Sequence, residues 1–285
     1  MLVLVAACGK PAPPPHDNPK PVAPKRADAS TTVAPAVQTY DDLGAALKAT
    51  IPDDARVIGF GELHSRTDRA QVTSTLAHFT TEALPALQDK VSDVIIETWV
   101  VDKGCGKQAT EATAKMAITM RRPIETKSEI AVLVEAVRAA GLQAHAMRVT
   151  CDDYTRIAPP GKEVDPVAML TLTTKELGRI ATEAVIHRDK EPAHKPWIAL
   201  YGGALHNDRF PDDAVAEWSY AKKVDDVSAN HFVEIDLIVP ELAEGDDALK
   251  KQPWFPVVAQ AGTKHQVWKR GERSFVIVLP RAKEP

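Results

Sequence analysis

The sequence predicts an α/β protein with a mostly parallel central sheet, helices on both faces and a site at the carboxyl ends of the strands. Short apolar segments alternate along the chain with amphipathic ones, which is the pattern of right-handed strand–helix–strand crossovers. The segment Asp93–Trp99 is a β-branched run, as in a strand that is covered on both faces. Several apolar segments also end on a polar group, and ligands bind at the carboxyl ends of parallel strands.

Each element follows from its local pattern. The first helix is expected over 40–50, because Tyr40, Leu43 and Leu47 recur at helical spacing and acids occupy the first turn. Gly141 ends a strong later helix and begins the strand that follows it. The other elements are expected, in chain order, as strand 56–61, helix 71–88, strand 93–99, helix 129–140, strand 142–148, helix 173–188, strand 197–200 and strands at 231–240 and 274–279.

One domain, 39–285, is expected to hold these elements, after a leader over 1–8 and a tether over 9–38. The chain has 285 residues, 44% hydrophobic and 26% charged, which is ordinary for a globular protein. The formal net charge is −4 and lysine and arginine form no long runs, so we expect no nucleic-acid partner. Two longer polar insertions, 101–128 and 207–230, are expected to cover the strand ends as lids.

The first residues, Met1–Cys8, resemble the end of a bacterial lipoprotein signal with a lipobox at 5–8. The resemblance implies cleavage before Cys8, a lipid on its sulfur and the membrane as a partner. The apolar run is short, and the positively charged segment that usually precedes it is missing. The alternative is therefore an apolar N-terminus with one buried cysteine. Residues 9–38 are rich in proline and poor in large apolar residues, which predicts an extended, disordered tether. With Gly9 in place of an aspartate, we expect a lipid-anchored protein of the bacterial cell envelope, at the outer membrane.

The two other cysteines are expected to pair. Cys105 follows the strand that ends near Glu97, and Cys151 follows the strand that ends at Arg148. Successive strands usually lie near each other, so the two thiols are expected to meet and to brace the loops of the site. The alternative is a pair of unbonded, buried thiols.

Four residues at predicted strand ends are the candidate catalytic residues. Glu62 and His64 close the first strand, Glu97 closes the next, and His206 ends a later one. Groups at the carboxyl ends of parallel strands converge although they lie far apart in the sequence. The expected site therefore holds two carboxylates and two imidazoles.

This set of groups allows two kinds of chemistry. His64, Glu97 and His206 are the expected ligands of a divalent Zn, Mn, Fe or Co ion with one open position. The same groups without a metal would perform general acid–base catalysis, with a histidine as the base and a carboxylate fixing its tautomer. Three further residues are expected to contact and orient the side chains of the site: Arg69, Arg148 and Asp208.

Short motifs of the chain resemble the erythromycin esterase/ChaN-like superfamily, which includes haem-binding lipoproteins, macrolide esterases and TraB/TIKI-type metalloproteases. The motifs are Tyr40–Leu47, Arg56–His64, Val94–Glu97 and Leu200–His206. The resemblance implies an α/β fold with the site above the strand ends, and it implies that Glu62, His64, Glu97 and His206 are the functional residues. The pattern departs from the haem binders at Ser65, where they usually carry an aspartate.

The expected function is a membrane-tethered hydrolase that acts on an ester or amide bond of a small molecule or peptide. The alternatives are a lipoprotein that binds haem or iron without turnover, and a catalytically inactive partner-binding domain. Two carboxylates with two histidines exceed what axial haem ligation needs. The chain also has only 5 Trp, 4 Tyr and 6 Phe, whereas a haem cavity is rich in aromatic residues. The sequence leaves the substrate and the oligomeric state open.

Overall fold

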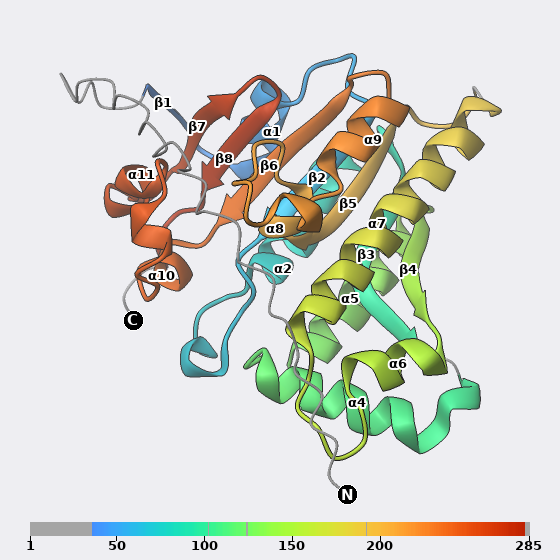
Figure 1. The fold of residues 1–285 in the computed structure, drawn as a ribbon. Helices are drawn as coiled ribbons and strands as arrows, with labels where there is room; N and C mark the ends of the chain where they lie inside the picture. Colours follow the sequence, from blue (N-terminus) through green and yellow to red (C-terminus); the bar gives the residue numbers. More distant parts are fainter. Residues whose placement is uncertain (1–35, 102, 124, 192, 283–285) are drawn as a thin grey trace, which may run out of the picture. The chain divides into compact units, whose positions relative to one another are not determined.

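The computed structural model describes residues 36–101, 103–123, 125–191 and 193–282 (Figure 1). The chain separates into two units, 1–34 and 35–285, and all that follows concerns the second. The expected lipidation site Cys8 and nearly all of the expected tether lie outside the described residues. In the described part of the chain, none of the helices combines the length and the apolar composition that a bilayer-spanning segment needs.

The core of the fold is a mostly parallel eight-stranded sheet with the strand order β1-β7-β8-β6-β2-β5-β3-β4. The strands are β1 (Val37–Tyr40), β2 (Val57–Glu62), β3 (Val91–Val101), β4 (Gln143–Val149), β5 (Trp197–Gly203), β6 (Phe232–Ile238), β7 (His265–Gly271) and β8 (Ser274–Val278). Only β7 runs against its two neighbours, β1 and β8, and the other neighbouring pairs are parallel. The α/β class and the mostly parallel sheet are therefore confirmed.

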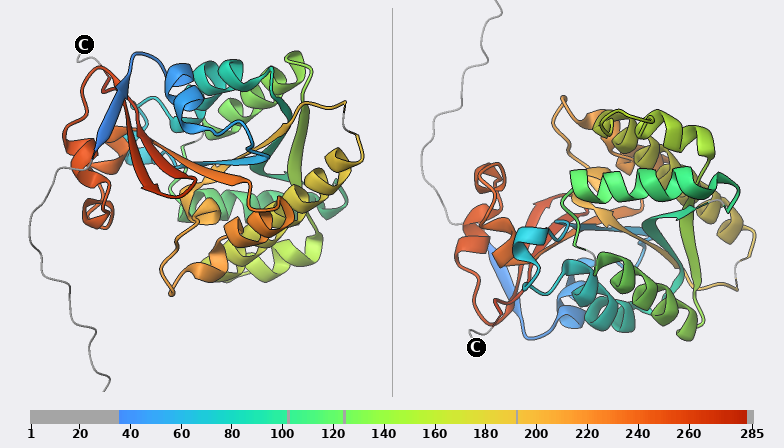
Figure 2. Two further views of the ribbon diagram at one scale, coloured as in Figure 1. Left: turned by 90° about the horizontal axis from the view of Figure 1, so that it is seen from above. Right: turned by 90° about the horizontal axis from the view of Figure 1, so that it is seen from below.

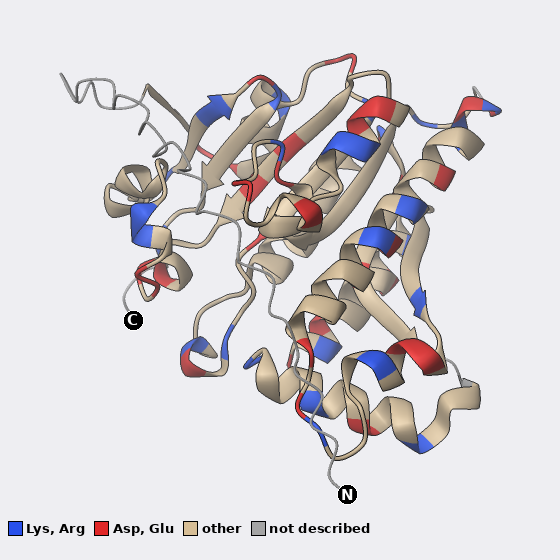
Figure 3. Cartoon of the chain, in the orientation of Figure 1, with Lys and Arg blue, Asp and Glu red and all other residues tan. Residues whose placement is uncertain are grey.

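Helices pack on both faces of this sheet (Figure 2). They are α1 (Leu43–Thr50), α2 (Thr75–His78), α3 (Leu84–Leu87), α4 (Gly106–Thr119), α5 (Thr126–Ala139), α6 (Cys151–Ile157), α7 (Pro166–Asp189), α8 (Ala204–Asn207), α9 (Ala221–Val227), α10 (Pro240–Ala243) and α11 (Phe255–Ala259). A π-helical turn, Phe79–Ala83, joins α2 to α3. Acidic and basic residues are interspersed over these elements (Figure 3).

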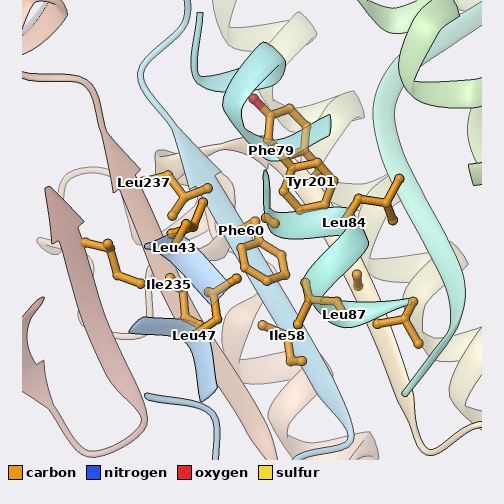
Figure 4. Packing of buried hydrophobic residues seen from close by; sticks show 14 of the residues in the cluster. Leu43, Leu47, Ile58, Phe60, Phe79, Leu84, Leu87, Tyr201, Ile235 and Leu237 are labelled. Atoms are coloured by element: carbon orange, nitrogen blue, oxygen red, sulfur yellow. The ribbon is translucent and has the colours of Figure 1, made fainter. Parts of the chain in front are cut away.

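The two faces of the central strands build two separate apolar clusters. On one face, Phe60 and Tyr201 pack with α1, α3, α5 and the π-helical Phe79 (Figure 4). On the other face, Ile95 and Leu200 pack against α7 and α9. Every residue of β2 and β5 is buried, because successive side chains point to opposite faces and both faces are covered. The central strands are therefore rigid supports for the groups at their ends.

Several boundaries differ from the sequence-based expectation. The first strand, Val37–Tyr40, begins inside the expected tether, and α1 starts only at Leu43, where Asp42 caps the helix by accepting the Ala45 N–H at 2.7 Å. The expected helix over 71–88 begins at Thr75 and contains the π-helical turn. The insertion 101–128 contains α4, and Cys105, directly before this helix, forms a disulfide with Cys151, the first residue of α6.

Candidate active site

Three neighbouring strands bring the two predicted glutamates to one edge of the sheet. β5 lies between β2 and β3. Glu62 is the last residue of β2 and stands opposite Gly203 of β5. Glu97 lies in β3 where its register with β4 shifts between Ile96 and Trp99. Such irregularities re-aim the side chains that they contain, and Glu97 points toward the end of β5.

His64 lies between the two carboxylates. Its Nδ1 is 2.5 Å from Oε1 of Glu62, and its Nε2 is 3.7 Å from Oε1 of Glu97. Because a carboxylate only accepts hydrogen bonds, the neutral imidazole carries its proton on Nδ1. Its Nε2 then has a free lone pair on the side of Glu97. Glu62 thus fixes both the orientation and the tautomer of the ring.

An arginine and a tyrosine complete this cluster. The two terminal nitrogens of Arg122 lie 3.7 Å from Oε1 of Glu62 and 3.9 Å from Oε1 of Glu97. The hydroxyl of Tyr201 donates a short hydrogen bond to Oε2 of Glu62. Burial and the Glu62 charge together hold the pKa of Tyr201 well above its ordinary value, so this hydroxyl stays a donor. The guanidinium of Arg122 therefore interacts with both carboxylates. The side chains of Glu62 and Glu97 are only 7% and 13% exposed.

Glycines at the end of β5 give these side chains room. A Cβ on Gly202 would lie 2.6 Å from Oε2 of Glu97, and a Cβ on Gly203 would lie 2.9 Å from Nε2 of His64. Gly203 also donates its backbone N–H to Oε2 of Glu97 at 2.6 Å. A larger residue at either position would push the glutamate or the imidazole out of place, which explains the two glycines.

Both glutamates are held in the ionised form. Burial works to raise the pKa of Glu97, but interactions with the protonated forms of His206 and His64 and with the charge of Arg122 outweigh it and leave that pKa below its ordinary value. Burial also opposes ionisation of Glu62, and interactions with protonated His64 and with Arg122 again lower its pKa overall. The site therefore presents two carboxylates that stay negative in neutral solution.

His206 reaches the same region from the short helix α8, which directly follows β5 (Figure 1). Only 3% of the residue is exposed. Its Nδ1 lies 3.0 Å from the carbonyl oxygen of Trp218 and 2.8 Å from the hydroxyl of Thr174. A carbonyl oxygen only accepts, so in the neutral imidazole Nδ1 carries the proton and Nε2 has the free lone pair. The backbone of the second insertion thus sets the tautomer of the second histidine.

A cavity of about 450 Å³ opens next to these groups. Its polar end includes His64, Glu97, Arg122 and His206. The remaining wall comes from α4, α5, α7 and the end of β3. A concave, largely apolar cavity with a few converging polar groups is the usual form of a small-molecule site.

The predicted metal ligands do not form a ligand set in this arrangement. Among residues 36–282, less the three single positions left undescribed, no group of three or more His, Cys, Asp or Glu side chains is placed to hold a metal ion. The Nδ1 atoms of His64 and His206 are already bonded to Glu62 and to Trp218, and Oε2 of Glu97 is bonded to Gly203. The metal site at His64, Glu97 and His206 stays a prediction, and we derive no step through a metal.

The three expected supporting residues lie elsewhere. Arg69 lies against Gly245 and helps to lower the pKa of Glu244, near α10. Arg148 is an exposed residue of β4, the strand at the edge of the sheet. Asp208 follows His206 in sequence but pairs with Arg270 at 2.7 Å. The support for His206 comes instead from Thr174 and the carbonyl of Trp218.

The arginine of the site is Arg122, which no motif of the sequence marks. It lies in the insertion 101–128, which was expected to cover the strand ends, and Pro123 follows it. Tyr201 lies in the Leu200–His206 motif, which by itself gives this residue no role. Its position could have been inferred, because it lies two residues before Gly203 on a strand where alternate side chains share a face.

Comparisons with known proteins add little to this geometry. No protein-family model matches the chain, and no curated protein matches it significantly. Among solved structures, the type III effector HopBA1 is similar, with 13% sequence identity and a TM-score of 0.42 over 88% of this chain and 100% of that chain. A likeness at this level carries no argument about fold or function.

Proposed function

We propose that this protein is a hydrolase that cleaves an ester or amide bond by general acid–base catalysis at His64. One observation carries the proposal: Glu62 holds the proton on Nδ1 of His64, so that Nε2 is left as a base beside the cavity. A histidine that is oriented by a carboxylate and faces a cavity is the usual arrangement for proton transfer to and from a substrate.

In the proposed reaction, a water molecule attacks the substrate carbonyl carbon while Nε2 of His64 takes one of its protons. The new carbon–oxygen bond gives a tetrahedral intermediate with a negative oxygen. When the intermediate collapses, the bond to the leaving alcohol or amine breaks. The imidazolium returns its proton to that leaving group, so the reaction consumes one water and leaves the enzyme unchanged.

The neighbouring groups would support this reaction in distinct ways. Arg122 lines the cavity, and its positive charge would stabilise the negative oxygen of the intermediate. Glu62 would stabilise the imidazolium that forms on His64. Glu97 lies 3.7 Å from Nε2 of His64 and would orient the attacking water beside it. His206, with Nε2 unprotonated, is placed to accept a hydrogen bond from the leaving group or from water.

The test is the hydrolysis of p-nitrophenyl esters by the purified wild-type chain and by His64→Gln. Removal of a general base typically lowers the rate by roughly 10²–10⁴-fold, and we expect a loss of kcat/KM in this range. The matched control is His145→Gln, because His145 is also a histidine paired with a carboxylate, Asp93, at 2.7 Å. That variant should keep wild-type activity.

Two results would overturn the proposal. One is an active His64→Gln variant, which would show that another group is the base. The other is an inactive wild type that develops a Soret band when haemin is added and loses this band in His64→Gln. The second result would support the alternative function, which is haem binding without turnover.

The proposed place of action is the bacterial cell envelope, with the catalytic domain anchored through a lipid on Cys8. The support is the lipobox-like start and the proline-rich stretch that follows it. Cells that express the full chain with radiolabelled palmitate should yield labelled protein in the membrane fraction. Cys8→Ser should be unlabelled and recovered in the soluble fraction. Membrane recovery of the unlabelled variant would rule out this anchor.

A further inference from the structure

The cavity beside His64 is unusually rich in methionine. The chain has 5 methionines, and Met116, Met120 and Met169 all line this one cavity. Of the other two, Met147 is 1% exposed in the core beneath α7, and Met1 begins the chain. Methionine side chains are flexible and polarisable, and they form apolar surfaces that adapt to ligands of different shape.

The rest of the wall agrees with an apolar occupant. Trp99, Ile130 and Leu170 add apolar surface, and the polar side chains outside the site cluster are mainly threonines. Lys127 and Arg122 are the cationic members of the lining. Of the lining residues, only Glu97 is acidic, and its carboxylate is already bonded to the backbone of Gly203. The cavity therefore has an apolar body and a polar end, where Arg122 lies near the carboxylates of Glu62 and Glu97.

We infer that the substrate is an ester of an apolar carboxylic acid of medium chain length, and that its acyl chain occupies the methionine-lined cavity. The inference rests on the proposed function and names its substrate class. The hydrolysis product is a carboxylate with an apolar chain, and it matches this wall: the chain would lie against Met116, Met120 and Met169, and the carboxylate would lie at the polar end, beside Arg122. The volume of about 450 Å³ is within the usual range for small-molecule sites and leaves room for such a chain.

The charge pattern favours the acyl side of the ester over the alcohol side. Hydrolysis creates its negative charge on the acyl fragment, first on the intermediate and then on the product. Arg122 lies 3.7 Å and 3.9 Å from the glutamates that flank His64, so it is next to the reacting carbonyl. In the inferred complex the carbonyl lies beside Arg122, and the acyl chain extends from it into the apolar body of the cavity.

The first test measures binding without turnover. Calorimetry would compare sodium octanoate with sodium acetate on the wild-type chain. Ala117→Phe would fill the cavity, since Ala117 is part of its lining on α4. The matched control is Ile118→Phe, because Ile118 is the next residue of the same helix and is 77% exposed. We expect octanoate to bind at least tenfold more tightly than acetate, and we expect only Ala117→Phe to abolish this difference.

A second measurement needs no variant. In protein labelled with ¹³C at the methionine methyl groups, octanoate should shift the signals of Met116, Met120 and Met169. The signal of Met147 should stay in place, because this residue is buried in a different cluster. Unchanged signals of all the cavity methionines at saturating octanoate would overturn the inference, as would equal octanoate binding by Ala117→Phe and the wild type.

Ester hydrolysis separates this inference from the proposed function. We expect kcat/KM to be higher for p-nitrophenyl octanoate than for p-nitrophenyl acetate, and the preference should disappear in Ala117→Phe. Hydrolysis of the acetate without octanoate binding would overturn the substrate class and keep the hydrolase. Octanoate binding without hydrolysis of either ester would overturn the hydrolase and keep the apolar-acid ligand.

Discussion

Tyr201 acts on the charge of Glu62 together with His64 and Arg122, against the effect of burial. Its buried hydroxyl donates to Oε2 of Glu62 and so helps to lower the pKa of that glutamate. Tyr201→Phe removes the donor and leaves the ring packed near Phe79, at a ring-centroid distance of 4.5 Å. The pKa of Glu62 should rise, so a larger fraction of the enzyme should lose the carboxylate that orients His64 as the pH falls.

The measurement is the pH profile of kcat/KM for p-nitrophenyl octanoate. In Tyr201→Phe the acid limb should move to higher pH, and the plateau of kcat/KM should fall by less than about tenfold. A hydrogen bond to a charged partner is worth about 1.5–3 kcal/mol at most. Part of this energy is lost equally in the ground state, so it does not lower the rate. Tyr220→Phe is the control, since Tyr220 is also a buried tyrosine, packed on Phe232. An unshifted acid limb in Tyr201→Phe would show that Glu62 does not control the rate.

At the scale of single residues, the sequence predicts the site residues that lie at strand ends. It misses the residues that long-range packing brings to the site. Glu62 and His64 follow from the end of one apolar strand, and Glu97 follows from another. Arg122 reaches them only because the insertion folds back over the sheet, with the N–H of Thr67 donating to the carbonyl of Arg121 at 2.9 Å. No local pattern encodes that contact.

At the scale of elements, the disulfide connects α4, which forms one wall of the cavity, to α6. Cys105 and Cys151 are separated by 46 residues, and closing a loop of this order is typically worth roughly 2–4 kcal/mol. The same end of α4 packs in a small cluster with Tyr154 and Met169. Without the disulfide, α4 should be held less firmly, and the wall that carries Met116 should become looser.

The Cys105→Ser/Cys151→Ser double variant tests this role. We expect a lower melting temperature, by several degrees or more, and a loss of the preference for octanoyl over acetyl ester. Hydrolysis of the acetate at a temperature below the transition should be nearly unchanged, because the glutamates lie in β2 and β3, His64 follows β2, and none of the three lies on α4. Retention of the octanoyl preference would show that packing alone holds the wall.

Element boundaries were predictable where a local signal ends the element. Gly141, with a positive φ of 71°, follows α5 and was expected to stop that helix. The start of α7 also carried a signal that the apolar pattern obscured: Asp165 accepts the N–H of Ala168 at 3.0 Å, and Pro166 opens the helix. By contrast, β1 exists through its pairing with β7, far away in the sequence, and neither strand was expected.

At the scale of the whole molecule, a parallel sheet followed from the alternation of strands and helices, but the order of the strands did not. One consequence of that order is a buried acidic pair on β6. Burial, together with the nearby Asp208 charge, raises the pKa of Glu234 to about 7. Burial and the Glu234 charge raise the pKa of Asp236 well above its ordinary value. Asp208, Arg270, Asn207 and Tyr220 also interact with Asp236.

This pair should make the protein less stable as the pH rises. Both pKa values are raised in the folded state, so between the ordinary carboxyl pKa and about 7 the folded chain binds more protons than the unfolded chain. The free energy of unfolding therefore falls with increasing pH over this range, by up to about 1.4 kcal/mol per pH unit for each fully responding group. The stability that the protonated pair contributes is complete below the ordinary carboxyl pKa.

Asp236→Asn isolates this effect, because asparagine resembles the protonated acid and cannot ionise. Its carbonyl oxygen can still accept from Asn207, which lies 3.5 Å from Oδ1 of Asp236. We expect melting temperatures close to wild type at pH 5 and several degrees higher than wild type at pH 8. Asp247→Asn is the control, since Asp247 has a 92% exposed side chain and should follow the wild type at both values. If Asp236→Asn lost the same stability as the wild type between pH 5 and pH 8, the buried aspartate would have to be ionised throughout. Asn207 and Arg270 would then have to stabilise its charge fully, in spite of its burial beside Glu234.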